Sequence, residues 1–527
     1  MKYLFLSLCA LVSLALFGQS NTTTEDWFNA DLIEDQRAGV GVDKVYSTLL
    51  VDKEPQDVIV AVIDSGVDIE HEDLDDVIWV NEDEIPDNGI DDDNNGYIDD
   101  VHGWSFISGP EEDVLYDNLE FTRIYKGLKE RFEGKEKGEV AKADRKDYDR
   151  FLTMEKQYAS RVEKARKELG EFKQIVDLYY FAKEQMKQVF GHEDYTLEDV
   201  EALEATDEAG AALKDFMIFV FESDFANQID EGMRQLNNTL NYSYNLNLNA
   251  REIIGDDITD PNDRYYGSNR VEGPRAEHGT HVAGIIAAER GNGIGVDGVC
   301  ASARIMVLRV VPDGDERDKD IANAIRYAVD NGAKVINMSF GKSYSPNKIW
   351  VDEAVKYAEQ KGVVMVHAAG NSSRNNDKSE NFPNPVDEIS REICTTWIEV
   401  GASTDDVENL VAPFSNYGKK SVDLFAPGYE ILSTIPNDEY KKNSGTSMAA
   451  PVVSGVAALL FSYYPDLSGK DVRNILVNSY RWYGRVDVIR PGSKPKEVPF
   501  KKICRTGGLV DPYNALKMAE QYKSSAK

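Results

Sequence analysis

The sequence predicts an α/β fold in which helices flank a parallel sheet, with a large, mainly helical insertion in the middle of the chain. The apolar, β-branched run at residues 58–63 is typical of a strand buried on both faces of a parallel sheet. From residue 276 onward, similar runs alternate with helical stretches, which indicates successive strand-helix-strand units. Between these regions, residues 111–250 are rich in charge and show a helical periodicity.

The second α/β region is expected to supply most of the sheet. Its apolar runs predict strands, and two stretches between them predict helices that cover the sheet. The predicted strands are 305–308, 335–338, 363–366, 397–400 and 422–425, and the predicted helices are 321–330 and 351–360.

The insertion carries apolar residues at spacings of three and four, as in Phe151, Met154, Tyr158 and Val162. This spacing places them on one helix face. The segment 196–199 has the sequence of a capping box and predicts the start of a further helix. We expect two or three antiparallel helices and assign this block no chemistry.

The N-terminus predicts export. Lys2 precedes an apolar run over residues 3–17, and small residues follow at Gly18 and Ser20. The run is shorter than the roughly 20 residues that a membrane-spanning helix needs. This pattern predicts a signal peptide over residues 1–20 and a secreted or periplasmic protein, with no stable membrane anchor after cleavage. A retained anchor is the alternative, and no later stretch has the length and apolarity of a span.

The charge balance argues against nucleic acid as a partner. The chain has 527 residues, with 93 Asp and Glu against 59 Lys and Arg, and a formal net charge of −34. Nucleic-acid affinity comes mainly from clustered cations, which this composition does not offer.

The cysteines do not form a disulfide framework. Cys9 should leave with the signal peptide, and Cys300, Cys394 and Cys504 then remain, far apart in sequence. The expected state of each is a buried thiol, although one pair could bridge.

Three short segments carry residues suited to nucleophilic chemistry. Residues 62–66 end a predicted strand and contain Asp64; residues 277–284 open a helix and contain His278; residues 444–451 run into an apolar helix and contain Ser447. A serine hydroxyl is a poor nucleophile unless a base takes its proton, and a buried carboxylate can orient a histidine for that task. Each segment alone is weak evidence, but the three together in the order Asp, His, Ser are specific.

These segments resemble those of the subtilisin family, the subtilases, over residues 57–109 and 271–520. The resemblance implies a serine endopeptidase that hydrolyses peptide bonds through an acyl-enzyme intermediate, with protein or peptide substrates. It implies that Asp64 orients, His278 acts as general base and acid, and Ser447 is the nucleophile. His281, one helical turn after His278, is not the family's base.

The resemblance also extends to the substrate-binding residues. It implies that Asn371 donates to the oxyanion and that two segments form the walls of the pocket for the P1 side chain, the substrate side chain just before the scissile bond. The first wall is Ser339, Phe340 and Gly341, which would also pair with substrate backbone, and the second is Ala368, Ala369 and Gly370. Phe340 and Lys342 depart from the commonest family residues, which leaves the P1 preference open.

One acidic loop predicts structural Ca²⁺, and no organic cofactor is expected. Asp91, Asp93, Asn95 and Asp99 occupy ligand positions of an EF-hand-like loop, although His102 stands in the twelfth position instead of Glu. A solvated acidic turn is the alternative. The family resemblance implies a further calcium site at Asp73 and Asn292.

The domain organisation departs from the family. We predict a signal peptide at 1–20, an N-terminal lead at 21–56, the catalytic domain at 57–109 and 271–524, and a helical insertion at 110–270. The insertion separates the aspartate from the histidine, and the short lead leaves little room for the folded pro-domain that subtilases usually carry.

Two other functions remain as alternatives. One is a non-catalytic peptide-binding protein of the same fold. The other is a lipase or esterase, which would use Gly-x-Ser-x-Gly and the order Ser, Asp, His, unlike the order found here.

Overall fold

A computed structural model describes residues 26–205, 207–223, 225–387, 389–492, 494 and 496–525. The predicted signal peptide lies outside the described residues. The described chain divides into two compact units, one over residues 122–248 and the other over the remaining residues on both sides. The helical unit is narrower than the predicted insertion at 110–270, because residues 110–121 and 249–270 belong to the unit that holds the sheet.

A nine-stranded sheet forms the centre of the larger unit, in the order β10-β13-β7-β6-β5-β4-β1-β3-β2. All neighbours are parallel except the edge pair β10 and β13. The predicted α/β class is thereby confirmed. The strands are β1 (Val58–Asp64), β2 (Gly103–Ser105), β3 (Ala303–Arg309), β4 (Val335–Met338), β5 (Val364–Ala368), β6 (Trp397–Ser403), β7 (Leu424–Pro427), β10 (Arg481–Trp482) and β13 (Gly508–Leu509). Two hairpins lie outside the sheet, β8 (Ile431–Ile435) with β9 (Glu439–Asn443) and β11 (Asp487–Arg490) with β12 (Lys496–Pro499).

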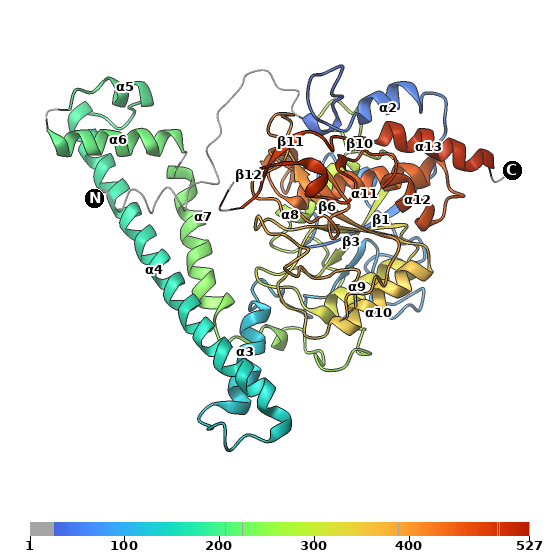
Figure 1. The fold of residues 1–527 in the computed structure, drawn as a ribbon, viewed down its shortest axis with the longest axis horizontal. Coiled ribbons are helices and arrows are strands. Elements are labelled where there is room, and N and C mark those ends of the chain that lie inside the picture. The colour runs from blue at the N-terminus through green and yellow to red at the C-terminus, as the bar shows by residue number, and fades with distance from the viewer. Residues whose placement is uncertain are drawn as a thin grey trace. The chain divides into compact units, whose positions relative to one another are not determined.

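Helices cover both faces of this sheet (Figure 1). Along β1, Val60 and Val62 belong to one buried cluster, whereas Ala61 and Ile63 belong to the other. This alternation explains the continuous apolar run in the sequence, since each face needs its own set of apolar side chains. One face packs against α2 (Val42–Thr48), α8 (Glu277–Ala287), α11 (Thr446–Tyr463), α12 (Gly469–Leu476) and α13 (Pro512–Ser525), and the other against α9 (Asp318–Asp330) and α10 (Lys348–Gln360).

Helix α11 is the one helix in the described residues that is long and apolar enough to cross a membrane, so the prediction that no later stretch has the length and apolarity of a span is wrong for this helix. It contacts the sheet, however, and 89% of its apolar window is buried inside the protein. Burial of this kind is typical of a core helix.

The smaller unit is helical, as predicted, and has its own apolar core. The predicted periodic face belongs to a single 46-residue helix, α4 (Arg145–Phe190), whose C-terminal half packs against α6 and α7. The predicted capping box is present, because Thr196 and Asp199 exchange side-chain and backbone hydrogen bonds at the start of α5. The other helices are α3 (Glu120–Phe132), α5 (Leu197–Ala202), α6 (Glu208–Glu222) and α7 (Phe225–Asn238), so the insertion holds more helices than expected.

Candidate active site

Asp64 and His278 lie together although 214 residues separate them. Asp64 ends β1 and is 1% exposed, and His278 is the second residue of α8. The His278 Nδ1–H donates to Asp64 Oδ1 at 2.7 Å, and the Ser65 backbone N–H donates to the same oxygen at 2.8 Å. This geometry fixes the imidazole with its Nε2 edge available to a third group.

The carboxylate determines the protonation of this histidine. Burial alone would lower the pKa of His278, but the charge of Asp64 and the hydrogen bond to it outweigh burial and raise the pKa above its ordinary value. A raised pKa makes the imidazole a stronger base.

His281 has a different environment. It is fully buried, and its Nε2–H donates to the backbone carbonyls of Ile431 and Lys441 at 3.0 and 2.9 Å. Burial lowers the pKa of His281 to about 4, so this histidine stays neutral. It therefore serves as a structural donor between α8 and the β8–β9 hairpin.

Ser447 is the second residue of α11 and forms a reciprocal pair with Ser339. Ser447 Oγ donates to the Ser339 carbonyl at 2.9 Å, and Ser339 Oγ donates to the Ser447 carbonyl at 2.8 Å. In the described part of the chain, no hydrogen bond joins Ser447 to His278. Such bonds often tighten only when substrate is present, and a contact with His278 would require Ser447 Oγ to rotate away from the Ser339 carbonyl.

Asn371 lies beside the first turn of α11. Its Oδ1 accepts from the backbone N–H of Thr446 at 2.8 Å and from the Thr446 hydroxyl at 2.9 Å. These two donors identify the oxygen end of the amide, and the Nδ2 end therefore faces the other way. Sequence analysis missed Thr446, which also accepts from the Gly370 N–H at 2.9 Å.

The segment Ala368–Gly370 begins at the last residue of β5, and two asparagines that sequence analysis did not assign to the site hold it. Asn381 Nδ2 donates to the Ala368 and Ala369 carbonyls, both at 3.2 Å, and Asn416 Nδ2 donates to the Ala369 carbonyl at 2.8 Å. Gly370 has a φ of 102°, which a side chain rarely adopts. The turn after β5 is therefore fixed at its carbonyls and restricted to glycine at its end.

The segment Ser339–Gly341 follows β4, and its neighbour Lys342 is turned inward. The Lys342 side chain is fully buried, and its Nζ lies 2.8 Å from Asp318 Oδ1 and 3.2 Å from Glu120 Oε2. It also donates to the Glu316 carbonyl at 2.6 Å. This cation is neutralised within the protein, so we expect it to contribute no acidic preference to a substrate pocket.

Asp73 and Asn292, for which the resemblance implied a calcium site, lie in contact. Asn292 Nδ2 donates to Asp73 Oδ1 at 2.7 Å, and the Val296 N–H donates to Asp73 Oδ2 at 3.0 Å. Burial raises the pKa of Asp73 against the effect of these donors. The carboxylate thus anchors the loop that follows α8.

The acidic loop after residue 90 gathers a different carboxylate group from the predicted one. One carboxylate oxygen from each of Glu84, Asp93 and Asp100 lies within 4.8 Å of the others, and Asn95 Nδ2 donates to Asp93 at 2.9 Å and to Asp100 at 3.0 Å. The oxygens of Asp91 accept instead from the Asn95 and Gly96 N–H groups, and those of Asp99 from the Asn88 and Gly89 N–H groups. The EF-hand-like spacing missed Glu84, which lies upstream of the loop.

The three cysteines described by the structure, Cys300, Cys394 and Cys504, are free and buried. Burial raises the pKa of each thiol to about 11, so they stay protonated.

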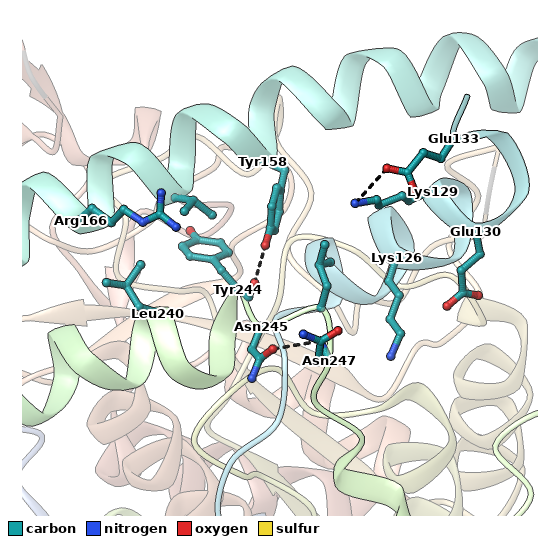
Figure 2. A pocket seen from close by; sticks show the side chains of 12 residues that line it. Lys126, Lys129, Glu130, Glu133, Tyr158, Arg166, Leu240, Tyr244, Asn245 and Asn247 are labelled. Carbon is teal, nitrogen blue, oxygen red and sulfur yellow. Dashed lines mark hydrogen bonds and ion pairs between the residues drawn. The ribbon is translucent and has the colours of Figure 1, made fainter. Parts of the chain in front are cut away.

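The helical unit has a groove of about 730 Å³ between α3, α4 and residues 240–247 (Figure 2). Lys129 pairs with Glu133 on one side of it, and Tyr158 donates to the Tyr244 carbonyl on the other. No residue that the sequence predicted for a site lines this groove.

The fold, a parallel sheet flanked by helices, is of the subtilisin-like class. A model of the subtilase family matches residues 55–501, and the chain belongs to this family. Over 187 residues it is 46% identical to a thermophilic serine proteinase of Bacillus sp. (strain AK1), a match that covers 35% of this chain and 42% of that protein. It is 41% identical over 199 residues to thermitase of Thermoactinomyces vulgaris, covering 38% of this chain and 64% of that protein. The matches thus span between 42% and 64% of these two relatives.

Among solved structures, the chain is similar to a protease of Pseudoalteromonas arctica PAMC 21717. The two share 31% identity with a TM-score of 0.37, over 46% of this chain and 70% of that one.

Proposed function

We propose that the protein is a serine endopeptidase that hydrolyses peptide bonds through an acyl-enzyme, with Asp64, His278 and Ser447 as its triad. The observation that carries this proposal is the 2.7 Å contact between His278 Nδ1 and Asp64 Oδ1 at the end of a parallel strand, in a chain of the subtilase family. When a buried carboxylate orients an imidazole whose other nitrogen stays accessible, the imidazole can activate a serine hydroxyl.

The proposed reaction begins when Ser447 Oγ leaves the Ser339 carbonyl and turns to His278 Nε2. The imidazole takes the hydroxyl proton as the oxygen attacks the scissile carbonyl carbon, and Asp64 stabilises the resulting imidazolium. The oxyanion would accept from Asn371 Nδ2 and from the Ser447 backbone N–H at the start of α11. His278 then gives its proton to the leaving amine as the C–N bond breaks, and water releases the acyl group by the same steps.

The same geometry supports binding of an extended peptide. Ser339–Gly341 follows β4, and Ala368–Gly370 starts at the last residue of the adjacent strand β5, so both segments lie at the carboxyl ends of these parallel strands. A substrate backbone paired with Ser339–Gly341 would be held as an added strand, with its P1 side chain between the two segments. The Phe340 ring is buried in the core, with its centroid 6.4 Å from that of buried His367, so Phe340 would offer its backbone to the substrate.

We also propose that the loop around Glu84, Asp93 and Asp100 binds Ca²⁺. Glu84 is 5% exposed and Asp100 is fully buried, and burial raises the pKa of Asp100 despite three hydrogen bonds to it. Three carboxylates this close repel one another, and a hard cation with a preference for oxygen ligands would remove that repulsion. A bound ion would stabilise the fold and takes no part in the proposed reaction.

We propose an exported enzyme, secreted or periplasmic, that acts on proteins or peptides and does not bind nucleic acid. The basis is the sequence, namely the N-terminal signal pattern and the net charge of −34.

The proposal is tested by casein hydrolysis together with a serine-directed fluorophosphonate probe. We expect the wild type to hydrolyse casein and to be labelled at Ser447, and Ser447→Ala to lose both properties, with peptide hydrolysis reduced by several orders of magnitude. A peptide-binding protein without activity would do neither, and a lipase would be labelled without cleaving casein. Labelling and hydrolysis that persist in Ser447→Ala would refute the triad.

A further inference from the structure

A buried arginine lies next to the aspartate that ends β1. Arg309 ends β3 and pairs in register with Asp64 across the parallel ladder, and its side chain is 1% exposed. The backbone N–H groups of Val310 and Val311 both donate to the Asp64 carbonyl, at 2.9 and 3.1 Å. The end of β3 therefore supports the backbone of Asp64 directly.

The Arg309 guanidinium joins three separate segments of the larger unit. Its Nε donates to the Ser65 carbonyl at 3.0 Å, in the turn that follows Asp64. One terminal nitrogen lies 3.0 Å from Ser108 Oγ and 3.1 Å from Asp113 Oδ1, in the chain that leads to the insertion. Gly273 lies against its face, where an added Cβ would come within 2.3 Å of the guanidinium carbon.

A second arginine closes the same cluster from the returning chain. Arg270 pairs with Asp113 at 3.3 Å and donates to the Gly109 carbonyl at 2.7 Å. Asp113 thus lies between two cations, one on the sheet and one on the chain that runs toward His278. Although burial alone would raise the pKa of Asp113, the Ser108 hydrogen bond and these two cations outweigh it and lower the pKa.

The loop held by this cluster is the one that carries His278 into place. Ser65 Oγ donates to the Arg275 carbonyl at 2.8 Å, and Gly66 approaches the Glu272 carbonyl so closely that an added Cβ would lie 1.8 Å from its oxygen. The turn after Asp64 and the loop before His278 therefore contact each other. Arg309 contacts both of them, the turn through the Ser65 carbonyl and the loop at Gly273.

We propose that Arg309 is a positioning residue. It holds Asp64 and His278 in their relative positions, although the insertion separates them in the chain. The chain leaves the sheet at Ser108–Asp113 and returns at Arg270–Gly273, and a single guanidinium contacts both stretches and the Ser65 turn. This inference rests on the proposed function, in which the Asp64–His278 contact orients the general base. Because a misplacement of about 1 Å can cost about a hundredfold in rate, loss of this support should reach the catalytic step.

The test compares Arg309→Met and Arg309→Lys with Arg304→Met. Arg304 lies on the same strand, but its side chain is 30% exposed and pairs with Asp57 at 3.0 Å. With a tetrapeptide substrate, we expect Arg309→Met to lower kcat by about ten- to a hundredfold and leave KM within about twofold. Arg309→Lys, which keeps a cation for Asp113, should recover part of kcat, and Arg304→Met should match the wild type.

A spectroscopic readout separates positioning from general stability. The proton between His278 Nδ1 and Asp64 Oδ1 should give a low-field proton NMR signal in the wild type and in Arg304→Met, and this signal should shift or broaden in the Arg309 variants. If Arg309→Met does not fold, Arg309→Lys and Ser108→Ala, which removes one partner of the guanidinium, decide the question. A folded Arg309 variant with wild-type kcat and an unchanged signal would overturn the inference. A wild type that is not labelled at Ser447 would refute the proposed function instead, while the NMR comparison would still test Arg309.

Discussion

Thr446 holds Asn371 by two hydrogen bonds to one atom: its backbone N–H and its hydroxyl both donate to Asn371 Oδ1, at 2.8 and 2.9 Å. An amide oxygen that accepts two donors cannot exchange places with its NH₂ group without losing both bonds. The residue just before the proposed nucleophile therefore decides which end of Asn371 faces the reacting atoms.

This relationship predicts graded effects on turnover. We expect Asn371→Ala to keep fluorophosphonate labelling but to lower kcat by about 10²–10³, as loss of an oxyanion donor does. Thr446→Val, which loses only the hydroxyl donor, should lower kcat by less. Asn478→Ala, at an exposed asparagine on the C-terminal side of α12, is the control. A loss of less than about tenfold in Asn371→Ala would exclude this residue from the oxyanion hole.

The two histidines of α8 should titrate at different pH values. Because Asp64 raises the pKa of His278, kcat/KM should fall as the pH drops through a value above the ordinary histidine value of about 6.5. In Asp64→Asn the carboxylate charge is gone, burial then dominates, and the midpoint of His278 should move to lower pH.

Proton NMR of the ring Cε1–H groups measures these midpoints directly. His281, with a pKa of about 4, provides an internal control that should not titrate between pH 5 and 8. An Asp64→Asn protein in which the His278 midpoint stays where it was would mean that Asp64 does not control this imidazole.

The buried Lys342 should be important for stability. Lys342→Met leaves the buried carboxylates of Asp318 and Glu120 without this cation, and removal of one partner from a buried ion pair costs about 3–5 kcal/mol in the free energy of unfolding. Lys441→Met removes an exposed pair with Glu277 and should cost less than about 1 kcal/mol. Urea unfolding measures both changes, and equal losses in the two variants would contradict the role of burial.

Calcium binding predicts a stability that depends on chelators. An ion that binds only the folded state stabilises it by mass action, so a chelator should lower the Tm. Replacing both Asp93 and Asp100 by Asn should shrink that shift, whereas Asp75→Asn, at an exposed aspartate outside the cluster, should leave it intact. A Tm that does not respond to the chelator would remove the support for a calcium site.

The sequence predicted six of the nine strands of the sheet and missed the short strands β2, β10 and β13 at its two ends. The six strands and the residues proposed to react both lie in short local patterns. A continuous apolar run predicts a two-faced strand, and Asp64, His278 and Ser447 lie in segments that resemble those of one family. Thr446 and Asn416 were missed because their partners lie far away in the chain, as for Asn371 and Thr446, which are 75 positions apart. Asn381 bonds carbonyls only 12 and 13 positions away, but no motif marks the loop between them. No local spacing records such a hydrogen bond.

The acidic loop shows a second limit of sequence analysis. The EF-hand-like spacing assumes that ligands come from one loop, whereas Glu84 reaches in from outside it and accepts from the Asp92, Asp93 and Asp99 N–H groups. In this arrangement Asp100, and not Asp91 or Asp99, lies with Glu84 and Asp93. Arg309 was missed for the same reason, since the residues that make it structurally important lie 157 residues apart at Asp113 and Arg270.

The helical unit should be separable from the unit that holds the sheet. Residues 122–248 have an apolar cluster of their own, in which Tyr179 and Met186 of α4 pack with Phe216 and Val220 of α6. The segments beside them are fixed within the larger unit, as Arg251 is by ion pairs to Asp256 and Asp320 at 2.6 and 2.9 Å. We therefore predict that a protein with residues 122–248 replaced by a short Gly/Ser linker folds and cleaves a tetrapeptide at the wild-type rate.

Because the insertion lies shortly before His278 in the sequence, we propose that it restricts large substrates, and the shortened protein should then cleave casein faster than the wild type. Equal casein rates in the two proteins would exclude a gating role, and a shortened protein that fails to fold would show that the helical unit is needed for folding.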